Sequence, residues 1–375
     1  MDFDLADHQI LLQKTAEEFT NREISPVASQ IDRENRLPDD LIGKMANAGF
    51  LGMNLPEEFG GAGIGCLDCA LVIEKIASSG TGVWWLPAFC DSIPECILKF
   101  GTEEQRRKYL KSVSEGSVYP SIQFTEAGTG SDPEALVTRA KSAEGHYIIN
   151  GMKRFSTFGA RDGFAILYAK DESGECTAFI IEKNTRGYSP SKIYELMGSG
   201  GAEPADVYFE DLKVPVENIL GKPGHGMDIL QYWIALEKIQ QCAACLGIAD
   251  AAMDEAILFA KTCKVRGKTQ SSLQGIRWML AEMHAKLQAI RTVTYRAAFF
   301  KDKSAGDWIV QAASAKLFVV PTAIEVVDIS RRIHGGYGYV KEFKIERLYR
   351  AIAGASAIAT SLEINKSIVG AAVLK

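Results

Sequence analysis

The first third of the chain carries apolar residues at helical spacing. Leu12, Ala16 and Phe19 recur on one helix face. Breaks are predicted at the glycine-rich stretch 57–65, EEFGGAGIG, and before Thr102, where Thr-Glu-Glu is a typical helix start. We therefore expect a helical domain over residues 1–120.

The pattern changes between residues 121 and 225. Short runs of β-forming residues alternate with Gly, Asp, Asn and Pro, and they cover residues 147–150, 165–169, 178–181 and 207–209. This pattern predicts a small antiparallel β domain.

From residue 226 onward the pattern is helical again. A sustained apolar stripe, typical of a long helix in a bundle, is formed by Leu273, Ile276, Leu280, Met283, Leu287 and Ile290. The predicted fold class is therefore mainly α with a central β domain, and the last domain, residues 226–375, is a helical bundle.

Composition narrows the class of function. The 375 residues include 42 Lys and Arg against 47 Asp and Glu, and the formal charge is −5. Without a basic patch, nucleic-acid binding is a poor hypothesis. The acidic start MDFDLADHQ does not resemble a secretion or mitochondrial targeting signal, and we see no apolar run that predicts membrane insertion. We expect a cytoplasmic protein.

The cysteines and glycines do not indicate a common metal or nucleotide motif. Cys66/Cys69 and Cys242/Cys245 have CxxC spacing, but the second pair lies in an Ala-rich helical stretch, so we interpret both as packing residues and expect no metal. The glycines at 60–65 and 198–201 follow no clear strand, which argues against a Rossmann domain, and no phosphate loop is present.

Several motifs lie where helices give way to strands and in the last third of the chain. Thr125, Gly128, Gly130 and Ser131 form a small, polar segment that suits close approach of a ligand to the backbone. The further motifs are INGMKRFSTFGA (149–160), FEDLKVPVENILG (209–221), LAEM (280–283) and RIHGGYGY (332–339).

In the order and spacing of these motifs the whole chain resembles the acyl-CoA dehydrogenase family. The resemblance implies an N-terminal helical domain, a β domain and a C-terminal four-helix bundle. It also implies FAD as cofactor, an acyl-CoA thioester as substrate and electron-transferring flavoprotein as acceptor. A homo-oligomer, commonly a tetramer, is expected.

The resemblance also assigns roles to residues. Ile122, Phe124, Thr125, Gly130, Phe155 and Thr157 would contact the flavin, with Phe155 at a position usually held by tryptophan. Ser131 would bind the CoA part, and Trp85 and Lys238 would contact the substrate. Gln274, Arg332, Gly335 and Gly336 would hold the ADP half of a neighbouring subunit's FAD, and Lys264 or Arg266 would compensate its pyrophosphate charge.

The family's usual catalytic glutamate is absent. Where the family carries it, before Gly-Thr-Ser, this chain has Ala353. Two carboxylates could replace it. Glu237 matches the position used by the isovaleryl-CoA branch, and Asp91 lies among Trp84, Trp85 and Phe89 in a segment expected at the acyl end of the pocket. A carboxyl group buried there would have a raised pKa.

These features lead to one hypothesis and two alternatives. The favoured one is a 1,4-elimination of cyclohex-1-ene-1-carboxyl-CoA to the 1,5-diene, with Asp91 as base and hydride transfer to flavin N5. The first alternative is an ordinary 1,2-dehydrogenation of a short branched or cyclic acyl-CoA with Glu237 as base. The second is a catalytically silent bundle protein.

Overall fold

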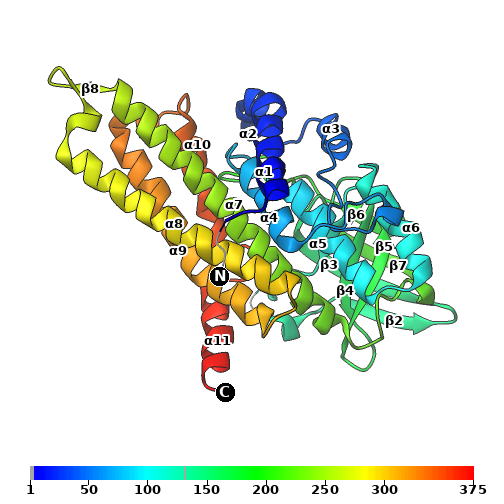
Figure 1. The fold of residues 1–375 in the computed structure, drawn as a ribbon. Helices are drawn as coiled ribbons and strands as arrows, with labels where there is room; N and C mark the ends of the chain where they lie inside the picture. Colours follow the sequence, from blue (N-terminus) through cyan, green and yellow to red (C-terminus); the bar gives the residue numbers. More distant parts are fainter. Residues whose placement is uncertain (1–3, 131) are drawn as a thin grey trace.

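The computed structural model describes residues 4–130 and 132–375. The element order is helices, then strands, then helices, so the predicted fold class is confirmed. Figure 1 shows the bundle of long helices on one side and the sheet on the other, with the N-terminal helices packed against both. Ser131 lies outside the described residues.

The N-terminal helices are formed by the segments with helical apolar spacing. Their bounds are α1 Asp7–Phe19, α2 Ala28–Glu34, α3 Leu41–Asn47, α4 Cys66–Ala77, α5 Trp85–Phe100 and α6 Glu103–Ser114. Helix α6 begins at the predicted site, because the Thr102 side chain accepts a hydrogen bond from the backbone N–H of Gln105.

The central domain contains seven strands in one sheet. They are β1 Ser121–Gln123, β2 Arg139–Ala143, β3 His146–Thr157, β4 Phe164–Lys170, β5 Cys176–Glu182, β6 Tyr188–Pro190 and β7 Pro204–Pro215. All four predicted β runs fall within these strands.

The sheet is mixed, although we predicted an antiparallel one. β3 pairs antiparallel with β2 and β7, but β1 runs parallel to β4, with Ser121 opposite Ala165. The parallel pair arises because the chain crosses from β1 to β4 through β2 and β3 and not through a tight hairpin. This crossing places the end of β1 next to the end of β3.

The C-terminal helices form the bundle. Their bounds are α7 Gly226–Thr262, α8 Gln274–Asp302, α9 Trp308–Ile333, α10 Lys344–Ala353 and α11 Leu362–Val373. A two-stranded hairpin, β8 Lys264–Val265 and β9 Lys268–Thr269, joins α7 to α8. From the predicted stripe on α8, Met283, Leu287 and Ile290 are buried in the bundle.

Helix α9 is long and apolar enough by length and composition to cross a membrane, and no other helix in the described parts of the chain is. In the structure it packs against α7, α8, α10 and α11, with residues such as Val319, Val320, Val326 and Val327 buried. Its apolar character is thus used for packing within the bundle.

Helix α4 of the N-terminal domain crosses α7 in close contact. A side chain at Gly247 would place its Cβ 1.9 Å from the carbonyl oxygen of Glu74. Nearby, the Tyr295 hydroxyl on α8 donates to the Glu74 carboxylate at 2.6 Å and accepts a hydrogen bond from Gln13 at 3.1 Å. The N-terminal helices are therefore fixed to the bundle by backbone contact and by a buried polar group.

Candidate active site

The two segments expected to contact the flavin ring lie side by side in the β domain. The backbone N–H of Arg154 donates to the carbonyl of Thr125 at 2.6 Å, and the Ser156 hydroxyl donates to the Gln123 side chain at 2.5 Å. The structure thus brings Ile122, Phe124 and Thr125, which surround the end of β1, together with Phe155 and Thr157 from the end of β3.

The end of β3 carries a local distortion. The register of β3 against β7 shifts between Lys153 and Ser156, and both Phe155 and Phe158 adopt left-handed backbone conformations, with φ of 55° and 57°. Such values are unfavourable for bulky residues and persist where the surroundings hold them. Phe158 is buried, whereas Phe155 is 56% exposed and packs on Tyr194 at 5.1 Å between ring centroids.

This geometry fits a flat aromatic cofactor. The Phe155 ring is exposed two residues before Thr157, and a Cβ added to Gly128 or Gly130 would meet nothing within 4 Å. The loop that carries these glycines is held by Glu126, which accepts hydrogen bonds from Val137 and Thr138 and pairs with buried Lys153 at 2.6 Å.

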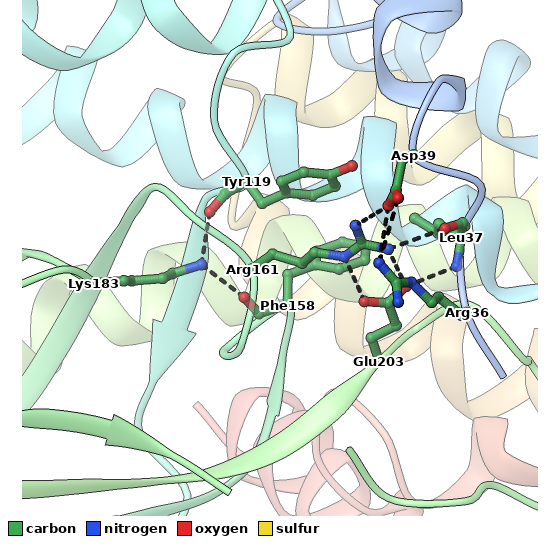
Figure 2. A network of polar contacts seen from close by, with 8 residues as sticks. All are labelled: Arg36, Leu37, Asp39, Tyr119, Phe158, Arg161, Lys183 and Glu203. Carbon is green, nitrogen blue, oxygen red and sulfur yellow. Dashed lines mark hydrogen bonds and ion pairs between the residues drawn. The ribbon is translucent and has the colours of Figure 1, made fainter. Parts of the chain in front are cut away.

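Polar contacts, shown in Figure 2, hold the turn after Thr157. The buried Lys183 ammonium donates to the carbonyls of Phe158 and Tyr119, each at 2.7 Å. Arg161 forms a two-point ion pair with Glu203 at 2.6 and 2.7 Å. Arg161 also donates to Asp39 at 2.7 Å, which ties the turn to the N-terminal domain.

A cavity of about 320 Å³ lies between this loop and the bundle. Its lining is almost entirely apolar, and among the described residues that form it Lys238 is the only charged one. These residues are Phe124, Gly130, Pro133, Met227, Leu230, Gln231, Ile234, Lys238, Ile309, Thr360, Ile364 and Ile368. The cavity therefore joins the predicted flavin segment to α7, α9 and α11, and it suits an uncharged organic group.

Glu237 lies at the edge of the α7 face that lines the cavity. It is two turns after Leu230 and one turn before Gln241, whose side chain donates to the carbonyl of Ala355 at 3.1 Å. The Glu237 side chain is 5% exposed and forms no hydrogen bond or ion pair within the described part of the chain. Burial raises the pKa of Glu237 to about 7, and the Lys316 and Lys238 ammonium groups oppose this rise.

The turn after Ala353, the residue at the position of the usual base, contacts Gln241 of α7. Ala353 ends α10 and is followed by a short 3-10 helix, Gly354–Ser356, whose Ala355 carbonyl accepts the Gln241 hydrogen bond. An alanine side chain cannot accept a proton. Glu237 is therefore a buried carboxylate one helical turn before Gln241, the α7 residue that contacts the turn without the ordinary base.

Asp91 is buried as expected, and its carboxyl group contacts other residues of the N-terminal domain. Oδ1 accepts a hydrogen bond from the backbone N–H of Met53 at 2.9 Å, and Oδ2 lies near the Cys69 thiol without a hydrogen bond of ordinary geometry. Burial raises the pKa of Asp91 to about 8, which confirms the direction predicted from its apolar neighbours.

Helix α5 contacts the side of α7 opposite the cavity. Trp233 donates to Ser92 at 3.2 Å and Gln240 to the carbonyl of Ala88 at 3.0 Å, and neither α7 residue lines the cavity. Asp91 does not line this cavity either, and its expected place at the acyl end of the substrate pocket stays a prediction. Trp85 is buried against Trp84, with ring centroids 4.1 Å apart, and is likewise absent from the lining.

The residues expected to hold the ADP half of FAD gather at the far end of the bundle. Gln274 begins α8, Arg332 lies in the last turn of α9, and Gly335 and Gly336 begin the 3-10 helix that follows. Figure 1 shows these ends of α8 and α9 beside β8. All four are exposed. Lys264 and Arg266 lie in the adjacent hairpin.

Sequence reasoning missed the buried cations Lys183 and Lys316 and the Arg161–Glu203 pair. Lys316 Nζ donates to three successive backbone carbonyls, those of Ile358, Ala359 and Thr360. Lys316 lies inside the apolar run of α9, and Lys183 directly follows a buried strand. Both positions could have indicated a buried cation with polar partners, because lysine is rarely buried without a partner.

Comparison with known proteins agrees with the geometry. Family models for the acyl-CoA dehydrogenase N-terminal, middle and C-terminal domains match residues 6–117, 121–212 and 224–374. The acryloyl-CoA reductase (NADH) of Anaerotignum propionicum is 34% identical, over 100% of this chain and 96% of that protein. A subunit of the caffeyl-CoA reductase–Etf complex of Acetobacterium woodii is 31% identical, over 97% and 98%.

The butyryl-CoA dehydrogenase of Megasphaera elsdenii has the same fold. Its solved structure matches with a TM-score of 0.96 and 31% identity, over 100% of both chains. On the three domain matches, the full-length relatives and this fold, the chain belongs to the acyl-CoA dehydrogenase family of FAD-dependent oxidoreductases.

Proposed function

We propose that the protein interconverts a compact saturated acyl-CoA and its α,β-unsaturated form, with Glu237 as the base. The observation that carries the proposal is the buried Glu237 carboxylate, which lacks a hydrogen-bond or ion-pair partner in the described chain. It lies beside the α7 residues that line the cavity and one helical turn before Gln241, which contacts the turn after Ala353. A buried carboxyl group with a pKa near neutrality suits proton transfer at physiological pH.

The chain's own residues supply binding and proton transfer. The apolar walls from Leu230, Ile234, Ile309 and Ile364 would hold the acyl group and exclude water. Glu237 would take the proton from the carbon next to the thioester carbonyl, and the same group would return it in the reverse direction. FAD, when bound, supplies the hydride acceptor.

The size of the cavity favours a compact acyl group. Its volume of about 320 Å³ is at the low end for sites that bind small organic molecules. Behind α7, the rings of Trp85, Phe89 and Trp233 fill the space toward α5. The names of two relatives, an acryloyl-CoA reductase and a caffeyl-CoA reductase subunit, support a short or planar acyl group.

The same comparisons support a proposal for the redox partner. We propose electron-transferring flavoprotein as the redox partner, supported by the name of the Acetobacterium relative. We also propose a homo-oligomer, a tetramer as the family resemblance implies. Gln274 and Arg332 are exposed at the end of the bundle that carries β8, and Figure 1 shows this end away from the sheet.

The 1,4-elimination of a cyclohexenoyl thioester with Asp91 as base is the second candidate. Its supporting observation is the raised pKa of the fully buried Asp91 carboxyl group. The contacts of that group with Met53 and Cys69, and its place across α7 from the cavity, favour Glu237.

The test compares Glu237→Gln with Asp91→Asn. Purified enzyme is assayed with butyryl, isovaleryl, cyclohexanoyl and cyclohexenoyl thioesters, and the double-bond position in each product is determined by NMR. We expect Glu237→Gln to lose about 10² to 10⁴ in turnover of a saturated substrate. Asp91→Asn should retain most of it.

The opposite pattern would overturn the proposal. If Asp91→Asn abolishes turnover of the cyclohexenoyl thioester and Glu237→Gln does not, Asp91 is the base. Normal flavin content in both variants is the control for folding. If neither the parent protein nor a variant turns over any thioester despite bound flavin, the silent-homologue alternative is supported.

A further inference from the structure

Arg161 and Glu203 form a largely buried ion pair with two contacts. The guanidinium donates from Nε and Nη2 to the two carboxylate oxygens, at 2.6 and 2.7 Å. The two side chains are 14% and 1% exposed. Two parallel hydrogen bonds between planar groups fix direction as well as distance. The pair therefore holds the two segments that carry it in one relative orientation.

These two segments lie on either side of Thr157, one of the residues expected to contact the flavin. In the register of β3 against β7, Thr157 lies opposite Pro204, which directly follows Glu203. Arg161 ends the turn that follows Thr157, and its backbone N–H donates to the Phe158 carbonyl at 3.1 Å. The ion pair thus links this turn back to the start of β7, next to Thr157.

The backbone around the pair adopts conformations that need support. Glu203 has a φ of 48°, and Phe155 and Phe158, at the end of β3, have φ of 55° and 57°. Left-handed backbone is unfavourable for such side chains and persists where the surroundings hold it. The two-point ion pair and the Lys183 ammonium on the Phe158 carbonyl supply that support.

The pair also contacts the N-terminal domain, as Figure 2 shows. The backbone N–H of Leu37 donates to Glu203 Oε1 at 2.7 Å, and Arg161 Nη2 donates to the Leu37 carbonyl at 3.0 Å. Leu37 is buried, and both of its backbone polar groups bond to the ion pair. The turn after Thr157 is therefore fixed relative to the N-terminal domain as well as to β7.

We propose that Arg161 and Glu203 are positioning residues for FAD: they hold the Thr157 hydroxyl and the neighbouring Phe155 ring in the arrangement that the flavin requires. The flavin contacts of Thr157 and Phe155 are those that the family resemblance implies. Cofactor binding does not depend on which carboxylate is the base, so this role holds for either mechanism.

The first experiment uses the flavin-loaded protein. It is diluted, release of FAD is followed by the rise in FAD fluorescence, and the visible circular dichroism of the bound flavin is recorded. We expect Arg161→Met to bind FAD about 10- to 100-fold more weakly and to change the dichroism, because losses of this size are typical when a residue that orients a ligand-binding group is removed.

The matched control is Arg36→Met. Arg36 is 59% exposed and pairs with Asp39, which also accepts from Arg161, so this variant removes an arginine from the edge of the same network. FAD affinity and dichroism should match those of the parent protein. An equal loss of affinity in Arg36→Met and Arg161→Met would overturn the proposal.

A second variant separates positioning from folding. Arg161→Met alone leaves the Glu203 carboxylate buried without its cation, which is strongly destabilising in itself. In Arg161→Met/Glu203→Gln this buried charge is gone, and the glutamine oxygen can still accept from Leu37. We expect its urea midpoint to lie near that of the parent, with weakened FAD binding and changed dichroism. Affinity and dichroism equal to those of the parent would overturn the proposal.

A double-mutant cycle tests whether the pair acts through Thr157. FAD affinity is measured in the parent, in Thr157→Val, in Arg161→Met/Glu203→Gln and in the combination. If the pair positions the Thr157 hydroxyl, loss of that hydroxyl costs less affinity where the pair is already absent. Equal costs in both backgrounds would overturn the proposal, whatever the stability of the variants. Turnover is not measured, so the result is independent of the role of Glu237.

Discussion

Asp91 and Glu237 show what decides the behaviour of a buried acid. Both are helical, both are less than 6% exposed and both have pKa values raised by burial. Their carboxyl groups differ in the groups that surround them. Asp91 accepts a backbone hydrogen bond from Met53, whereas Glu237 has nearby cations and no hydrogen bond in the described chain. We therefore expect Asp91 to act on stability and Glu237 on activity.

The Asp91 carboxyl group should make stability depend on pH. Its pKa is raised from 3.8 to about 8 on folding, so the folded state binds the extra proton between these values. The contribution of this group to the free energy of unfolding is therefore fully present below about pH 4. It is lost as pH rises toward 8, at up to about 1.4 kcal/mol per pH unit. Asp91→Asn should remove this slope in urea unfolding measured from pH 5 to 8.

The matched control for this prediction is Asp40→Asn. Asp40 is exposed, and its hydrogen bond to Lys44 lowers its pKa, so it titrates below the window. An unchanged slope in Asp91→Asn, with a changed one in Asp40→Asn, would contradict the prediction.

For single residues, the sequence predicted burial and the pKa shift of Asp91, but it did not predict which neighbouring helix each side chain contacts. The apolar neighbours of Asp91 predicted its burial and its raised pKa, because desolvation depends mainly on local composition. Which side of α7 faces α5 could not be inferred, since it depends on contacts such as Trp233 with Ser92 that join residues far apart in the chain.

Among the elements, the end of β3 shows how a strand can present side chains that regular pairing would not. The bulge against β7 allows Phe155 to be exposed and Phe158 to be buried within four residues. The run of β-forming residues at 147–150 predicted the strand, but it carries no signal for a bulge or for the parallel pairing of β1 with β4, because both are set by tertiary contacts.

Lys183 should be needed to hold the turn after Thr157 in place. Replacing it with methionine leaves the carbonyls of Tyr119 and Phe158 without their buried donor, and we expect a loss of about 2–4 kcal/mol in urea unfolding, since each unsatisfied buried group costs about 1–3 kcal/mol. Flavin retained after gel filtration should also fall. Lys192→Met, at a side chain 89% exposed, is the control and should change neither quantity.

For the whole molecule, the end of the bundle that carries Gln274 and Arg332 also exposes apolar side chains. Leu273, just before α8, is 40% exposed, and Trp278 on α8 is 65% exposed. Tyr339 is 86% exposed. Exposed apolar groups in the neighbourhood of predicted cofactor residues favour burial by another copy of the chain.

Trp278→Glu should therefore yield a smaller species and less bound flavin. Size-exclusion chromatography with light scattering and the flavin-to-protein absorbance ratio test both effects. Leu11→Glu on α1 is the matched control, because Leu11 is 64% exposed and lies in the N-terminal domain. A Trp278→Glu protein of unchanged mass with full flavin content would contradict the prediction.

The crossing of α4 over α7 at Gly247 limits the way in which substrate can enter. The Glu74 carbonyl leaves no room for even a methyl group there, and Tyr295 links Glu74 to α8 and to Gln13. A hinge between the N-terminal helices and the bundle would have to break this backbone contact. We therefore expect a thioester to enter between the glycine-containing loop after β1 and α11, which both line the cavity.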